Sequence, residues 1–85
     1  MIKALLILEL DDDEGFVYRE IEMPISPFSG MILMLGESAA WRQLVIDNVM
    51  LNFANDEHPI ECWVSFCDGV YDRKWMESDG WSSSR

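Results

Sequence analysis

Residues 2–23 read IKALLILELDDDEGFVYREIEM, and this stretch decides the fold. Every even-numbered residue from Ile2 to Leu10 is apolar, whereas the odd positions are mixed, and this period of two is typical of a β-strand. An acidic run then ends at Gly15, a residue suited to a tight turn. From Phe16 to Met23 the pattern alternates again, with Arg19 among the apolar positions and two glutamates opposite. We therefore expect residues 2–23 to form a β-hairpin.

The rest of the chain predicts shorter elements separated by turn residues. Residues 24–30 contain two prolines and end in glycine, so we expect an irregular connection. The apolar run 31–35 lies between two glycines, which favours a short buried strand. Residues 60–66 alternate, with the even positions facing inward. Residues 72–78 predict a short helix, with Asp72 as its cap and Gly80 beyond its end.

Residues 38–54 permit two interpretations. Trp41, Leu44, Val45, Val49 and Phe53 have helical spacing, but a helix would leave other apolar residues of the segment off its apolar stripe. As a strand, the apolar phase changes at residues 47–48, as a β-bulge would require. The β-branched residues also prefer strands. We favour the bulged strand, and the helix stays as the alternative.

Together these elements predict a mostly β protein: a small five-stranded curled antiparallel sheet or barrel with a short C-terminal helix. The alternative is an α+β fold with a helix at about 38–54. The length of 85 residues fits a single domain. We expect that domain to span residues 1–81 and residues 82–85 to form a frayed tail.

Charge is the most unusual property of the sequence. The chain has 16 acidic and 6 basic residues and a net charge of −10. Such a field repels nucleic acids and anionic membranes and attracts basic surfaces, although acidity also serves solubility alone. Cys62 and Cys67 are five apart in one expected strand and point to opposite faces, so reduced thiols are expected. With no apolar run long enough to span a bilayer, we expect a cytoplasmic protein.

Motifs for catalysis or metal binding are missing from the sequence. The acidic run from Asp11 does not match a calcium loop, because Gly15 falls at the fifth position and not at the sixth. His58 and the two cysteines are too scattered for structural zinc. Nucleophile and phosphate-loop motifs are absent as well. We therefore expect no enzymatic activity, no cofactor and no metal.

The surplus of acids and aromatic rings favours a protein-binding role. The tryptophans are too many for so small a core, and exposed Trp, Met and Arg are typical of protein interfaces; the alternative is a tail that folds back as a lid. In size, charge and missing catalytic motifs, the chain is similar in general style to small anti-defence proteins of phages, including DNA-mimicking anti-CRISPR inhibitors, and to acidic nuclease-immunity proteins. This likeness implies an inhibitor that occupies the basic, nucleic-acid-binding surface of a partner protein. The expected contact residues are Asp11, Asp12, Asp13, Glu14, Glu20, Glu22, Asp56, Glu57, Glu61, Trp63, Trp75 and Trp81.

Two other functions are compatible with the same residues. One is a structural or assembly subunit that forms a homo-oligomer, such as a dimer, through edge strands and exposed tryptophans. The other is a small-ligand-binding barrel, which requires an interior that the Leu, Ile and Met side chains leave unfilled. In neither case does the sequence name the partner.

Overall fold

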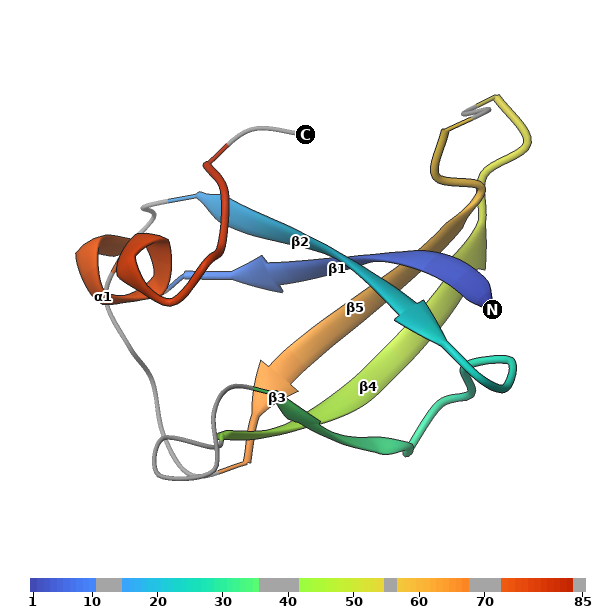
Figure 1. The fold of residues 1–85 in the computed structure, drawn as a ribbon, viewed down its shortest axis with the longest axis horizontal. Helices are drawn as coiled ribbons and strands as arrows, with labels where there is room; N and C mark the ends of the chain where they lie inside the picture. The colour runs from blue at the N-terminus through green and yellow to red at the C-terminus, as the bar shows by residue number, and fades with distance from the viewer. Residues whose placement is uncertain (11–14, 36–41, 55–56, 68–72, 84–85) are drawn as a thin grey trace.

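A computed structural model describes residues 1–10, 15–35, 42–54, 57–67 and 73–83 of the chain. These residues form five strands followed by one short helix (Figure 1). The elements are β1 (Ile2–Glu9), β2 (Phe16–Met23), β3 (Ile32–Leu35), β4 (Arg42–Leu51), β5 (Ile60–Phe66) and α1 (Arg73–Ser78). The predicted fold class is thereby confirmed, and the alternative with a helix at about 38–54 is wrong for residues 42–51.

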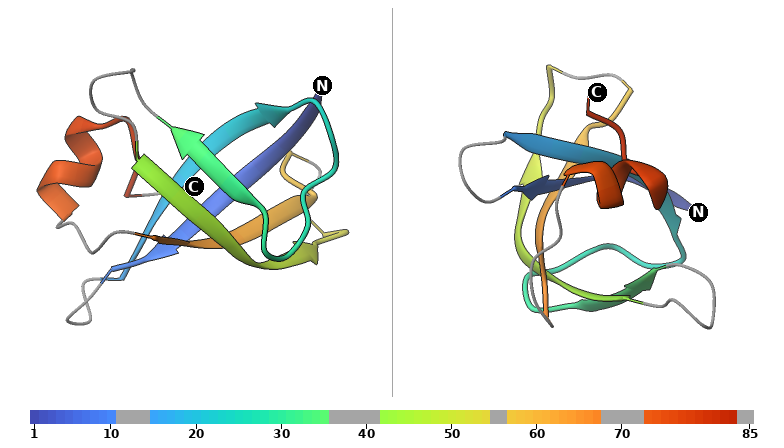
Figure 2. Two further views of the ribbon diagram at one scale, coloured as in Figure 1. Left: turned by 90° about the horizontal axis from the view of Figure 1, so that it is seen from below. Right: turned by 90° about the vertical axis from the view of Figure 1, so that its left-hand side faces the viewer.

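The five strands form one sheet in the order β2-β1-β5-β4-β3. The sheet differs from the expected antiparallel arrangement in one pair, because β1 and β5 run parallel. This pairing makes β1 an interior strand between β2 and β5, and its residues 4–8 are buried on both faces of the sheet. Seen end-on, the sheet curls into an open half-barrel whose two edge strands, β2 and β3, lie on either side of the opening (Figure 2, right).

Local sequence signals account for the two long antiparallel pairs. β1 and β2 pair along their full length, from Ile2 opposite Met23 to Glu9 opposite Phe16, as the hairpin pattern predicted. β4 pairs with β5, and its register shifts between Ile46 and Asn48. This shift is the expected bulge, because it moves the apolar phase of the strand by one residue and keeps both halves facing the core.

The concave side of the sheet holds the hydrophobic core, and the C-terminal segment closes one end of it (Figures 1 and 2). Met76 of α1 is fully buried, and Trp81 is only 4% exposed. After the helix, Gly80 adopts a positive φ of 99°, which a helix end commonly requires. Ser82 then exchanges two backbone hydrogen bonds of 2.8 Å with Tyr18 of β2. Ser82, expected in a frayed tail, is therefore held against β2, and Ser83 bonds to Arg73 and Glu77 of α1.

Two further expectations about burial meet different outcomes. Cys62 is buried and Cys67 exposed, both are free thiols, and burial raises the pKa of the Cys62 thiol to about 11.

β3, expected as a buried strand, is an edge strand instead. Ile32 and Met34 point outward from it and are half-exposed, whereas Leu33 and Leu35 pack against the core. A continuous apolar run does not reveal this difference, because it has no polar phase that marks the outer face.

Candidate partner-binding surface

The convex outer face of the sheet is strongly acidic. The strand register places the outward-facing side chains of β1, β2 and β5 side by side, and Asp47 at the bulge reaches the same face, where Ser65 donates to its Oδ2 at 3.0 Å. Among the described strand residues, one base faces outward against five acids. The base is Lys3, and the acids are Glu9, Glu20, Glu22, Asp47 and Glu61.

The arginines of the strands face the opposite way. Arg19 of β2 lies on the concave phase and donates to the backbone oxygen of Asp79 at 3.1 Å, with the Asp79 carboxylate 3.8 Å away. Arg42 of β4 stacks over the Trp75 ring, 5.3 Å from its centroid. These cations hold the C-terminal segment and do not offset the acids of the outer face. The charges are thus separated because both arginines occupy inward-facing positions of their strands, whereas the acids occupy outward-facing positions.

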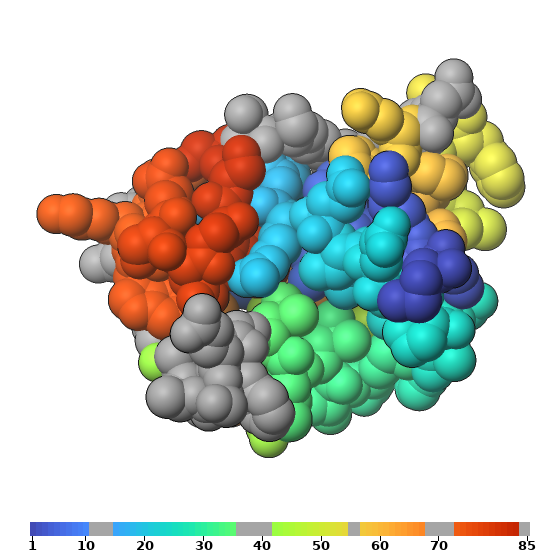
Figure 3. All heavy atoms as spheres, in the orientation of Figure 1, coloured from blue at the N-terminus to red at the C-terminus, as the bar shows by residue number. Residues whose placement is uncertain are grey.

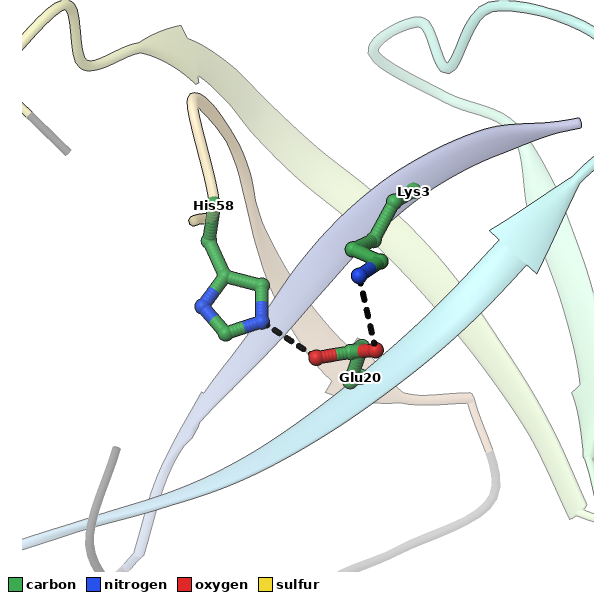
Figure 4. Close-up of polar contacts among 3 residues, drawn as sticks. All are labelled: Lys3, Glu20 and His58. Atoms are coloured by element: carbon green, nitrogen blue, oxygen red, sulfur yellow. Dashed lines mark hydrogen bonds and ion pairs between the residues drawn. The ribbon is translucent and has the colours of Figure 1, made fainter. Parts of the chain in front are cut away.

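A small polar cluster spans β1 on the outer face (Figure 4). Glu20 of β2 accepts a hydrogen bond from Nε2 of His58 and lies 3.6 Å from the ammonium nitrogen of Lys3. The His58 hydrogen bond, more than the charge of Lys3, holds the pKa of Glu20 below its ordinary value of 4.5. Between Glu20 and Glu61, Leu5 of β1 is buried. The cluster therefore favours the ionised form of Glu20, and the nearby ammonium group of Lys3 offsets part of its negative charge.

This cluster predicts a small acid-dependent contribution to stability. A carboxylate whose pKa is lowered by folding stabilises the native state above its unfolded pKa, and the contribution is lost as pH falls through the folded pKa. Thermal unfolding of Glu20→Gln and wild type between about pH 3 and pH 7 is expected to show a difference at neutral pH that shrinks as the pH falls below 4.5, the ordinary pKa of Glu20. Glu22→Gln is the matched control, because Glu22 lies two residues along the same face and makes no ion pair with a described residue. A Glu20 difference that does not change with pH would contradict the prediction.

The predicted contact acids do not all have the same surroundings. Glu20 and Glu22 lie exposed on the outer face, and Glu57 is exposed before β5. Glu61 is buried on the outer side of β5, where Asn52 donates to its Oε2 at 3.2 Å. The remaining predicted acids lie outside the described residues; they are Asp11, Asp12, Asp13, Glu14 and Asp56.

The tryptophans at positions 63, 75 and 81, which lie in the described residues, are used mainly for packing. Trp63, on the outer face, meets Phe16 edge-on at 5.4 Å between ring centroids, and its buried indole N–H has no hydrogen-bond partner among the described residues. Trp75 packs edge-on against Phe66 at 6.4 Å. Trp81 lies in the core. The alternative of a folded-back tail therefore describes Trp81 and most of Trp75, and of these three tryptophans only Trp63 belongs to the acidic face.

A group of exposed apolar side chains was missed by the sequence analysis. They belong to edge strand β3, to the connection before it and to the end of β4 and the turn after it, and they are Ile25, Phe28, Ile32, Met34, Met50, Leu51 and Phe53. Several of them line a groove of about 710 Å³ that runs between the C-terminal half of β2 and β3. In Figure 3 the groove follows the boundary between the light-blue to cyan atoms of β2 and the green atoms of β3.

Other site types have little support in the described residues. Within these ranges, no group of three or more His, Cys, Asp or Glu side chains is placed to hold a metal ion. No helix in the same ranges has the length and hydrophobicity needed to cross a bilayer. Comparisons of the chain with models of known protein families, with curated proteins and with solved structures found no match.

Proposed function

We propose that the chain is a non-catalytic protein-binding module whose acidic outer face occupies a basic surface of a partner protein. The observation that carries this proposal is the charge separation across the sheet: among the described strand residues, four exposed carboxylates and the buried Glu61 face outward against one lysine. Carboxylates displayed in this way attract a basic surface and repel nucleic acid. The basic surface that fits best is one that otherwise binds nucleic acid phosphates, so the module would act as an inhibitor in the cytoplasm.

Three exposed acids on this face form the core of the proposed contact. Glu9 of β1 and Glu22 of β2 belong to strands that pair along their whole length, and Glu20 lies between them on β2. Rigid strands hold the carboxylates in place, so the ordering cost of binding is smaller than for acids on a loop. Glu77 and Asp79 lie in the C-terminal segment and provide a comparison surface.

The test compares two glutamates that differ in position. Wild-type protein immobilised at low salt would capture the partner, which is then purified and titrated against Glu22→Lys and Glu77→Lys. Both variants change the net charge equally and both residues are exposed. We expect Glu22→Lys to weaken binding roughly three- to tenfold and Glu77→Lys to have a much smaller effect. Binding of wild type should also weaken steeply as salt is raised.

Two results would contradict the proposal. Equal effects of the two reversals would mean that the net charge alone acts, without a defined face. Binding that survives high salt would mean that apolar contacts dominate.

An assembly subunit remains the second candidate, and the exposed Ile32 and Met34 on edge strand β3 favour it. Light scattering separates the two functions, because a stable dimer at high salt would support assembly and a monomer would support the acidic module.

A further inference from the structure

The groove between β2 and β3 is the feature of the surface that the acidic face does not explain. It is lined on one side by residues 19–25 and on the other by residues 31–35, with Phe28 of the connection also contributing. Its lining combines apolar side chains with the two glutamates of β2 and with Arg19, whose guanidinium is already paired with Asp79. Edge strands with exposed apolar residues are usually protected in monomeric proteins, because they pair readily with other chains. The groove is therefore a place where an additional strand fits.

The backbone of β3 is open toward this groove. Ile46 donates to the backbone oxygen of Met31 at 2.9 Å, so the carbonyl of residue 31 faces β4. Because backbone groups alternate in direction along a strand, those of Leu33 and Leu35 also face β4, and those of Ile32 and Met34 face the groove. No backbone hydrogen bond between described residues reaches this edge. β3 thus offers a complete edge for main-chain pairing.

The opposite side of the groove is partly closed and carries the charge. Ser82 already pairs with Tyr18, so the outer edge of β2 is occupied at that residue. By the same alternation, the backbone groups of Glu20 and Glu22 face the groove beyond it, and their side chains lie on the outer face. The side chains of an added strand that point to the outer face would therefore lie between two neighbours. Ile32 and Met34 of β3 would flank them on one side, and the carboxylates of Glu20 and Glu22 on the other.

We infer that an extended segment of the partner protein, in which apolar and basic residues alternate, adds to the free edge of β3 as a sixth strand and fills the groove toward β2. Its inward side chains would pack near Met23 and Leu33, which favours apolar residues. Its outward side chains would be Lys or Arg, whose aliphatic stems commonly cover apolar surface while the charged group stays in water. Here the stems would pack on Ile32 and Met34, and the charged groups would lie near Glu20 and Glu22. This inference rests on the proposed function, because it specifies where and how the basic partner binds.

A second copy of the chain fits the groove less well. Each copy carries a net charge of −10, and pairing two β3 edges would bring two acidic molecules together. The charge complementarity of the groove instead favours an occupant that is basic.

The test uses a capped synthetic peptide of about eight residues in which lysine and valine alternate, a length typical of a strand. Its binding to the whole 85-residue protein is measured by titration and by amide hydrogen exchange. One control peptide carries glutamate in place of lysine, and another has the same composition in two blocks. We expect the alternating lysine peptide to bind most tightly and to protect the amides of Ile32 and Met34 from exchange.

Two variants at one position test main-chain pairing. Met34→Pro removes the N–H that faces the groove and leaves the hydrogen bonds to β4 in place, and an edge strand tolerates proline. Met34→Ala keeps the N–H and removes only the side chain. We expect Met34→Pro to bind the peptide about tenfold more weakly than Met34→Ala, provided that both unfold at similar temperatures.

Each outcome separates this inference from the proposed function. Equal binding by the proline and alanine variants would overturn strand addition, while a preference for lysine over glutamate peptides would leave the acidic module standing. Equal binding of the lysine and glutamate peptides would contradict both. An absence of peptide binding would overturn the inference, because the groove would then have no such occupant. A dimer that Met34→Pro abolishes would also overturn it, because a second copy of the chain would then occupy the groove.

Discussion

Replacing Trp81 by alanine is expected to lower the free energy of unfolding by about 3–5 kcal/mol, a large part of the stability of a domain of this size. The indole is 4% exposed and packs in the core together with Met76. Its removal leaves a cavity at the end of the half-barrel that strands alone do not close. Equilibrium unfolding in urea, followed by far-ultraviolet circular dichroism, measures the change.

The control for this variant is Phe53→Ala. Phe53 is 86% exposed in the turn after β4, so its loss should change stability by less than about 0.5 kcal/mol. If Trp81→Ala fails to fold, Trp81→Phe should still fold with an intermediate loss of stability. A Trp81→Ala protein as stable as wild type would show that the C-terminal segment is not part of the folded core.

The same segment explains why the surface is more one-sided than the composition alone implies. Arg19 and Arg42 hold it from two different strands, and Arg73 at the start of α1 donates to Ser83 at 2.7 Å. Three of the few cations are thus committed to internal contacts. The net charge of the chain is distributed accordingly, with the outer face of the sheet more acidic than its share of residues would give.

Much of the fold was predictable because its signals are local. The alternation in residues 2–23, the phase change near Asp47 and the glycine beyond α1 each act within a few residues, and each prediction was confirmed. The parallel pairing of β1 with β5 was missed, because it joins segments more than fifty residues apart and has no mark in either strand. The edge position of β3 was missed for the same reason.

The candidate site was predicted less completely than the fold. The sequence identified Glu20 and Glu22 as sharing one face, and they do. It gave all acids similar weight, although Glu61 is buried and other acids lie outside the described residues. A usable signal was present, since Arg19 occupies the apolar phase of β2 and Arg42 the phase of Leu44 and Ile46. An arginine at an otherwise apolar, inward-facing position of a strand indicates that it makes a contact on the concave side. The acids at the outward-facing positions are then left without a nearby positive charge.

The second large effect is expected at Ile7, on the outer face of β1. Outward-facing residues of a half-barrel are usually exposed, but Ile7 is only 1% exposed, because Tyr18 of β2 and Trp63 of β5 flank it. Phe16 packs on Trp63 and extends this cover. Ile7→Ala should therefore cost about 2–5 kcal/mol, as in a conventional core, although the residue faces away from the main core.

Ile32→Ala is the matched control, because it removes the same atoms from the same face of the same sheet. Ile32 lies on the edge strand and is 52% exposed, so its loss should cost less than about 1 kcal/mol. The two variants should also differ in binding: Ile32→Ala weakens binding of the alternating lysine peptide, and Ile7→Ala leaves the affinity unchanged wherever the protein is folded. Similar losses of stability from both variants would show that the outer face has no second packed cluster. Unchanged peptide binding by Ile32→Ala would show that the free edge of β3 is not where the partner docks.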